Sequence, residues 1–220
     1  MDRRDLAYIC NNLPVKPGIL GKEENFFNSA VLITLVEVNG EYHFLFELRA
    51  KKIKQADEVC FPGGKFEPKV DNSYQDTAIR ETMEELGILR KQIEIKGELG
   101  TIVAPMGATI DAFVAVLDIS DLDEIIIERE EVAEVFTVPV SYFRDNSPEK
   151  YHARLEIQPS YKDVDGNEQI YLPSRELGLP ERYHTPWGGK KYNIYVYRYN
   201  DKIIWGITAH LVREFVRLSC

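Results

Sequence analysis

Three glutamates at helical spacing are the residues of this chain with the clearest chemical potential. Glu81, Glu84 and Glu85 stand at i, i+3 and i+4, so a helix through them brings their carboxylates into one narrow arc. Like charges at this spacing repel by about 0.2–0.5 kcal/mol per pair, so the arc either faces water or binds a cation. Mg²⁺ takes oxygen ligands and combines carboxylates with waters and substrate phosphates. Arg80 stands beside them and can orient one carboxylate through a charge-assisted hydrogen bond.

The surrounding sequence predicts a loop followed by one helix. Residues 61–64, Phe-Pro-Gly-Gly, form a turn, because proline fixes φ and glycine allows backbone angles that other residues avoid. Asn72 or Ser73 can cap the helix, and Gly87 is suited to its end. Apolar residues at i, i+4 and i+7 give the side opposite the glutamates a stripe that would pack on a core: Ile79, Met83 and Leu86.

This window resembles the Nudix box. The family pattern is Gly, five residues, Glu, seven residues, Arg-Glu, an aliphatic residue, any residue, Glu-Glu, any residue, Gly and an aliphatic residue. Residues 80–88, RETMEELGI, supply its second half, and Gly64 matches its first glycine, so the box spans about 63–88. The resemblance implies a site for Mg²⁺ or Mn²⁺ held by three carboxylates: Glu81, Glu84 and Glu85.

The chain departs from the family pattern at two places. The interval from Gly64 to Arg80 is two residues longer than in the pattern. Both Glu67 and Asp71 therefore remain candidates for the early acidic position. Thr82 stands where the pattern has an aliphatic residue. Neither departure touches the carboxylates that would bind metal.

The resemblance also implies catalytic roles. Nudix enzymes commonly take a further carboxylate from a segment downstream of the box, as metal ligand or general base. Glu131 is our first choice for it and Glu130 the second, while a solvated acidic loop is the alternative. The proton of the attacking water would pass to Glu84 or Glu131. Arg80 would orient a carboxylate and would not bind metal.

A second resemblance concerns the substrate. In the Nudix branch that cleaves coenzyme A, a strand ending in Arg and a small residue precedes a basic residue, a glycine and Phe-Pro-Gly-Gly. Arg49-Ala50, Lys54 and residues 61–64 correspond, although the glycine is missing and the spacing is one residue short. Residues 204–209, IWGITA, resemble the branch's segment before its last helix. These matches imply coenzyme A or acyl-CoA as substrate, giving 3′,5′-ADP and 4′-phosphopantetheine.

The same segments supply candidate substrate contacts. The positive charges of Arg49 and Lys54 could meet a phosphate, or the basic loop could simply be solvated. Backbone amides at Gly63 and Gly64 could donate to a phosphoryl oxygen. The alternative substrate is ADP-ribose or another nucleoside diphosphate linked to a second group. A nucleotide-binding regulator without catalysis is the alternative from a different class, disfavoured by the intact box carboxylates and by the lack of a basic helix-turn-helix pattern.

Composition limits the kinds of protein and of binding partner that fit this chain. Of 220 residues, 44% are hydrophobic and 29% are charged, as in globular proteins, and no apolar run approaches the roughly 18 residues of a membrane span. The net charge of −9 disfavours nucleic acid and anionic membranes as partners. No signal peptide is visible, and three scattered cysteines indicate free thiols, so we expect a cytoplasmic protein. The partner would be a small phosphorylated substrate, and a homodimer is possible.

The order of strand-like and helical segments along the chain predicts an α+β fold. Asn39-Gly40 between two strand-like runs predicts a hairpin, and Asp165-Gly166 between residues 154–159 and 168–172 predicts a second one. Residues 172–191 are rich in Pro and Gly and predict a long excursion or lid, in which residues 187–191 form a turn or a phosphate contact. Further helices are expected over residues 2–13 and 207–218. The resemblance implies an α/β/α sandwich with a mixed sheet, as one domain over residues 1–220.

Overall fold

The computed structural model describes residues 8, 10–13, 18–52 and 55–219 of the chain. The helix expected over residues 2–13 falls largely outside the described residues, so it stays a prediction. Within the described part of the chain, no helix combines the length and apolar character needed to cross a membrane.

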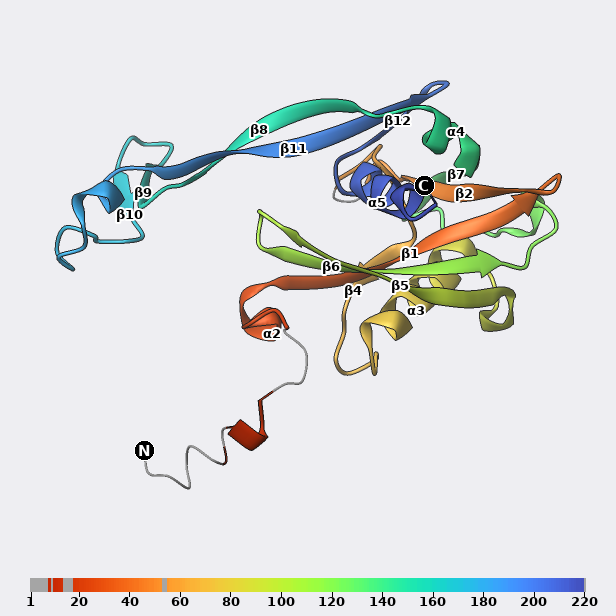
Figure 1. The fold of residues 1–220 in the computed structure, drawn as a ribbon, viewed down its shortest axis with the longest axis horizontal. Helices are drawn as coiled ribbons and strands as arrows, with labels where there is room; N and C mark the ends of the chain where they lie inside the picture. Colours follow the sequence, from red (N-terminus) through yellow and green to blue (C-terminus); the bar gives the residue numbers. More distant parts are fainter. Residues whose placement is uncertain (1–7, 9, 14–17, 53–54, 220) are drawn as a thin grey trace.

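A seven-stranded mixed sheet forms the centre of the molecule (Figure 1). Its strands are β1 (Phe27–Val38), β2 (Glu41–Arg49), β3 (Val59–Cys60), β4 (Gly63–Lys65), β5 (Ile93–Ala104), β6 (Ala108–Leu117) and β7 (Val132–Pro139). The main order is β3-β2-β1-β6-β5, with β4 paired to β1 and β7 paired to β2. The long pairing of β1 with β6 is parallel, and every other pairing in this sheet is antiparallel.

Helices cover both faces of the sheet, which confirms the predicted α/β/α sandwich. The long helix α3 (Tyr74–Leu86) packs on one face, while α4 (Val140–Asp145) and α5 (Gly206–Arg217) lie on the other (Figure 1). Side chains of a strand alternate between faces. Accordingly, Leu32 of β1 belongs to the core under α3, and Ile33 belongs to the core under α5. The helix expected over residues 207–218 is therefore present as α5.

The first predicted hairpin is confirmed. Val38 pairs with Glu41, which leaves Asn39 and Gly40 as a two-residue loop. Their φ angles are 52° and 83°, as a tight hairpin turn with two positive φ values requires. This turn sets the register of β2 against β1 and therefore the direction in which each later side chain of β2 points.

The second predicted hairpin is correct at its turn and wrong in its extent. Only β9 (Ser160–Lys162) and β10 (Glu168–Ile170) pair across the Asp165-Gly166 turn. Residues 154–157 instead belong to β8 (Glu149–Ile157), which pairs with β11 (Trp187–Tyr199). The physical reason is that a turn sequence fixes the reversal of the chain but not how far the ladder continues, and β11 offers β8 a longer partner.

The β8–β11 ribbon forms an arm that extends away from the sheet (Figure 1). β12 (Lys202–Trp205) pairs with the inner end of β11 and leads directly into α5. Residues 187–191, expected as a turn or phosphate contact, lie inside β11 at the outer end of the arm, with a bulge between Gly188 and Lys190. That end lies away from α3 in Figure 1, so this segment is not placed beside the box glutamates.

Candidate active site

The helix that carries the glutamates is fixed at both ends. At its start, the Ser73 hydroxyl oxygen accepts a hydrogen bond from the Asp76 backbone N–H at 3.1 Å, a standard N-cap contact. At its end, Gly87 has φ 61°, and a Cβ there would lie 2.4 Å from the Ile126 carbonyl oxygen. Glycine is therefore required where α3 turns away, and the helix has the predicted limits.

Arg80 is held by a buried carboxylate at the base of the loop. Its Nε lies 2.9 Å from Asp71 Oδ1 and its Nη2 lies 3.1 Å from Asp71 Oδ2. The Asp71 side chain is 2% exposed. The hydrogen bonds from Arg80 lower the pKa of this carboxyl to about 2, and bonds from the Glu67 N–H and the Thr77 hydroxyl add to the effect. Of the two candidates for the early acidic position, Asp71 therefore contacts the box arginine, and Glu67 contributes only its backbone.

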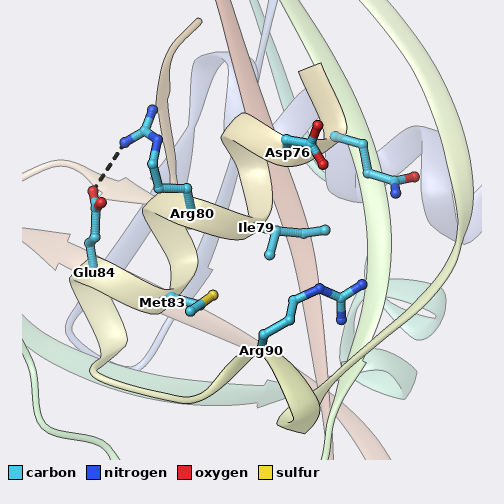
Figure 2. Close-up of a pocket in the computed structure, with 7 residues that line it drawn as sticks. Asp76, Ile79, Arg80, Met83, Glu84 and Arg90 are labelled. Carbon is cyan, nitrogen blue, oxygen red and sulfur yellow. Dashed lines mark hydrogen bonds and ion pairs between the residues drawn. The ribbon is translucent and has the colours of Figure 1, made fainter. Parts of the chain in front are cut away.

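Arg80 also contacts two of the box glutamates. Its Nη1 lies 2.9 Å from Glu81 Oε1 and 3.0 Å from Glu84 Oε2. Figure 2 shows the Arg80–Glu84 pair on one side of α3, and both residues line the same surface pocket as Met83 and Arg90. The Glu84 side chain is 60% exposed. Glu84 is thus the most accessible of the three carboxylates and is tied to the helix by the guanidinium.

Glu85 is the buried member of the set. The residue is 4% exposed, and its Oε2 accepts a hydrogen bond from the Gly63 N–H at 2.9 Å. Burial raises the pKa of this carboxyl to about 8, the bond from Gly63 opposes the rise, and the negative charge of Glu81 adds to it. Because Glu85 is buried and lies near another carboxylate, a cation bound beside it would stabilise its ionised form.

Glu81 lies against the glycine turn. A Cβ on Gly64 would stand 2.3 Å from the Glu81 carboxylate, and a Cβ on Gly63 would stand 2.3 Å from the Ala30 carbonyl oxygen. Burial raises the pKa of Glu81, Arg80 opposes that rise, and the charges of Glu84 and Glu131 contribute to it. Gly63 is therefore needed for the loop to fit against β1, whereas a Cβ at Gly64 would displace the Glu81 carboxylate.

The acidic segment before β7 is joined by a backbone hydrogen bond to the residue that follows β2. The Glu131 carbonyl oxygen accepts a hydrogen bond from the Ala50 N–H at 2.8 Å. The charge of Glu131 also raises the pKa of both Glu81 and Glu85. The structure therefore brings Glu131 to the box carboxylates. Glu130 is exposed, and its N–H donates to its neighbour Glu128 at 3.2 Å.

A NUDIX domain family model matches residues 27–156, more than half of the chain. The chain belongs to the Nudix family.

Individual relatives agree with this assignment. The chain is 36% identical to mouse "Peroxisomal coenzyme A diphosphatase NUDT7", with 61% of this chain and 55% of that protein covered. It is 32% identical to human "Mitochondrial coenzyme A diphosphatase NUDT8", over 56% of this chain and 53% of that protein. It is 26% identical to "Uncharacterized Nudix hydrolase NudL" of Yersinia enterocolitica, over 88% of this chain and 82% of that protein. The chain thus spans about half the length of the first two relatives.

A solved structure shows the same fold. The crystal structure of a MutT/nudix family protein from Enterococcus faecalis matches with a TM-score of 0.50 at 15% identity. The match covers 100% of this chain and 70% of that chain.

The departure at Thr82 from the Nudix pattern has a simple packing explanation. Thr82 is fully buried, and its hydroxyl donates to the Ala78 carbonyl oxygen at 2.6 Å. A threonine on a helix can satisfy its hydroxyl in this way with the carbonyl four residues earlier. The buried hydroxyl therefore has a hydrogen-bond partner. Thr82 can thus occupy the position at which the family pattern has an aliphatic residue.

One acidic residue near the Nudix box was missed from the sequence. Glu47 on β2 is 1% exposed, and its Oε1 has no hydrogen-bond partner. The sequence did contain a sign of it, because the stretch HFLFELR places a charged residue in a run of strand residues that must be buried. Burial raises the pKa of Glu47 well above its usual range, and the charge of Glu85 is the next contribution.

The residues of the Nudix site fit a hard divalent cation by their chemistry. The carboxylate oxygens gathered there are the ligand type that such a cation prefers, and one of them, Glu47 Oε1, is buried without a hydrogen-bond partner. Among the described residues, no three His, Cys, Asp or Glu side chains converge in a geometry ready to hold an ion. Instead, Glu81 pairs with Arg80, and Glu85 accepts from Gly63. Each of these two contacts uses one oxygen of the carboxylate, Oε1 of Glu81 and Oε2 of Glu85.

The candidate substrate residues lie beside this Nudix site. Arg49 ends β2, and its charge opposes the upward pKa shifts of Glu47, Glu85 and the Cys60 thiol. Its positive charge is therefore close to the buried carboxylates. Gly63 and Gly64 form the start of β4, directly ahead of α3. Lys54 lies outside the described residues.

A cavity of about 390 Å³ opens next to the glycine turn. Its wall includes Arg49, Phe61 and Gly63 from the segment before α3, and residues 205–208 from the segment before α5. The two segments are directly joined, since the Thr208 hydroxyl donates to the Val59 carbonyl oxygen at 3.0 Å. Apolar side chains from the arm and from the β5–β6 turn complete the wall, among them Leu155, Ile194 and Met106.

Proposed function

We propose that this chain is a metal-dependent diphosphatase that cleaves coenzyme A or acyl-CoA into 3′,5′-ADP and a 4′-phosphopantetheine product. One observation carries the choice of substrate. The two segments that resemble the coenzyme A-cleaving branch, residues 49–64 and 204–209, are far apart in the sequence and line the same cavity. That cavity adjoins the Nudix box at Gly63. The mouse and human relatives, both named coenzyme A diphosphatases, support the same substrate.

The box carboxylates would hold the metal. Glu85 would bind it from within the core, and Glu81 and Glu84 from the accessible side of α3. Bound Mg²⁺ or Mn²⁺ would neutralise phosphate charge and make a water molecule more acidic. Arg80, anchored by Asp71, would keep Glu81 and Glu84 aligned along α3 and would not itself be a ligand.

The remaining residues would place the substrate and remove a proton. The charge of Arg49 and the turn at Gly63 and Gly64 would face the diphosphate, with Lys54 as a further candidate. Glu84 or Glu131 would accept the proton of the attacking water, so that the P–O bond on the far side of the phosphorus can break. The mostly apolar cavity would receive the pantetheine chain, and an acyl group would extend it along the inner part of the arm.

A substrate panel tests the proposal. Purified protein with Mg²⁺ or Mn²⁺ is given coenzyme A, a medium-chain acyl-CoA, ADP-ribose and NADH in parallel, and products are identified by mass spectrometry. We expect 3′,5′-ADP and 4′-phosphopantetheine, and a higher kcat/KM for the coenzyme A substrates. A strong preference for ADP-ribose would remove the coenzyme A proposal but keep diphosphatase activity. Tight nucleotide binding without turnover of any substrate would favour the non-catalytic regulator.

Three features inferred from the sequence remain predictions. A cytoplasmic location and the lack of nucleic-acid and membrane partners are inferred from composition, and a homodimer is the third prediction. Light scattering of the purified protein measures the oligomeric state. Fractionation of cells that express the native chain measures its location.

A further inference from the structure

Glu47 is a buried carboxylate that the proposed reaction does not yet use. It lies near the end of β2, paired across the sheet with Cys60 of β3 and Val135 of β7. The residue is 1% exposed, and its Oε1 has no hydrogen-bond partner. A buried carboxylate without full hydrogen bonding is costly to the folded state, so its presence calls for a physical reason.

The alternation of β2 shows which way Glu47 points. Phe44 and Phe46 pack in the core under α5, whereas Leu45 packs in the core under α3. Glu47 is two residues beyond Leu45 and therefore shares its face. This direction leads to the C-terminal turn of α3, where Glu85 is buried.

The charged groups around Glu47 are mostly of its own sign. Glu85, Glu131 and Glu81 all disfavour its ionised form electrostatically, and Arg49 is the cation that opposes them. These neighbours come from three separate elements: α3, the segment before β7, and β2 itself. The guanidinium groups of Arg49 and Arg80 thus face four carboxylates, of which Glu47 and Glu85 are buried and Glu131 is exposed.

We propose that Glu47 is a further ligand of the divalent-metal site, reaching the ion from the sheet while Glu85 reaches it from α3. The inference rests on the proposed metal-dependent function. An oxygen-binding cation placed between the two elements would satisfy the unpartnered Oε1 and balance the excess negative charge in one step. It would also explain why β2 carries a glutamate at a position where an apolar residue would pack at lower cost.

Metal binding without substrate tests this ligand role. Titration with MnCl₂, followed by the electron paramagnetic resonance signal of free Mn²⁺, compares the wild type with Glu47→Gln. We expect the dissociation constant to rise by roughly tenfold or more, as the loss of a group that supports a metal site typically causes. The matched control is Glu41→Gln, which changes an exposed glutamate of the same strand and should bind Mn²⁺ as the wild type does.

Thermal melting separates a ligand from a structural residue. Without metal, Glu47→Gln and the apolar variant Glu47→Leu should melt at or above the temperature of the wild type, because a buried ionisable group among like-charged neighbours is removed. With Mn²⁺, both should show a smaller rise in melting temperature than the wild type. A fall in metal-free melting temperature together with unchanged Mn²⁺ affinity would overturn the inference.

Crystals of the unmodified protein provide a test that needs no variant. After a soak in MnCl₂, the anomalous difference map should show an ion bonded to both Glu47 and Glu85. An ion on the α3 glutamates alone would refute the role of Glu47 and leave the proposed function intact. If Glu85→Gln also binds Mn²⁺ as tightly as the wild type, the proposed metal site itself is wrong.

Discussion

The ion pair between Asp71 and Arg80 should contribute measurably to stability. Asp71→Asn keeps the shape of the side chain but removes the charge that accepts two hydrogen bonds from Arg80. The pKa of Asp71 falls from 3.8 to about 2 in the folded protein. Each pKa unit is worth about 1.4 kcal/mol, so the charge contributes about 2 kcal/mol. The side chains are 2% and 23% exposed, so solvent screening of this pair is limited.

The sign of the pH dependence follows from the lowered pKa. The folded state favours ionised Asp71, so its contribution is complete above the unfolded pKa near 3.8 and is lost as pH falls toward about 2. Asp71→Asn should therefore lower the free energy of unfolding by about 2 kcal/mol at neutral pH. The difference from the wild type should shrink once pH falls below about 4.

Urea unfolding followed by circular dichroism at several pH values measures this difference. Glu67→Gln is the matched control, because Glu67 is exposed and is the other candidate for the same position in the Nudix box. It should change stability by less than about 0.5 kcal/mol. The reasoning is refuted if the two variants cost the same at neutral pH, or if the cost of Asp71→Asn does not vary with pH.

Three further changes probe the site and its cavity. Gly64→Ala places a Cβ 2.3 Å from the Glu81 carboxylate, so turnover should fall by at least about tenfold while melting temperature changes little, since a flexible side chain can move aside. Glu85→Gln should abolish turnover, and so should addition of EDTA to the wild type. Activity after EDTA should return with Mn²⁺. Full activity in either case would contradict a metal role for Glu85. Thr208→Val removes the bond to the Val59 carbonyl and should lower the free energy of unfolding by about 1–3 kcal/mol. KM for coenzyme A should rise more than kcat falls, and an unchanged KM would argue against the cavity as its binding site.

The local elements of the site could be predicted from the sequence because their causes are local. The glycine turn, the Ser73 cap and the Gly87 end of α3 depend on backbone preferences of residues within a few positions of each other. The spacing of Arg80, Glu81, Glu84 and Glu85 fixes their arc on any helix. The hairpin at Asn39-Gly40 is local in the same sense, since two positive φ values suffice to define it.

Other features of the fold and the site depended on contacts between distant segments. The sequence of a turn does not say which strands pair or how far they pair. Residues 154–157 extend β8 along β11 instead of closing a hairpin with residues 168–172, because the longer ladder satisfies more backbone groups. The choice between Glu67 and Asp71 likewise required the folded loop, since only the Asp71 side chain reaches Arg80.

The sequence by itself determined the family of the protein and the helix that carries its acidic residues. Only the tertiary structure brought Glu47 close to Glu85 and joined residues 49–64 to residues 205–208 around one cavity. These contacts connect a strand, a helix and a C-terminal segment that are distant along the chain. They arise from sheet register and from packing on two faces, which no spacing within a single segment encodes.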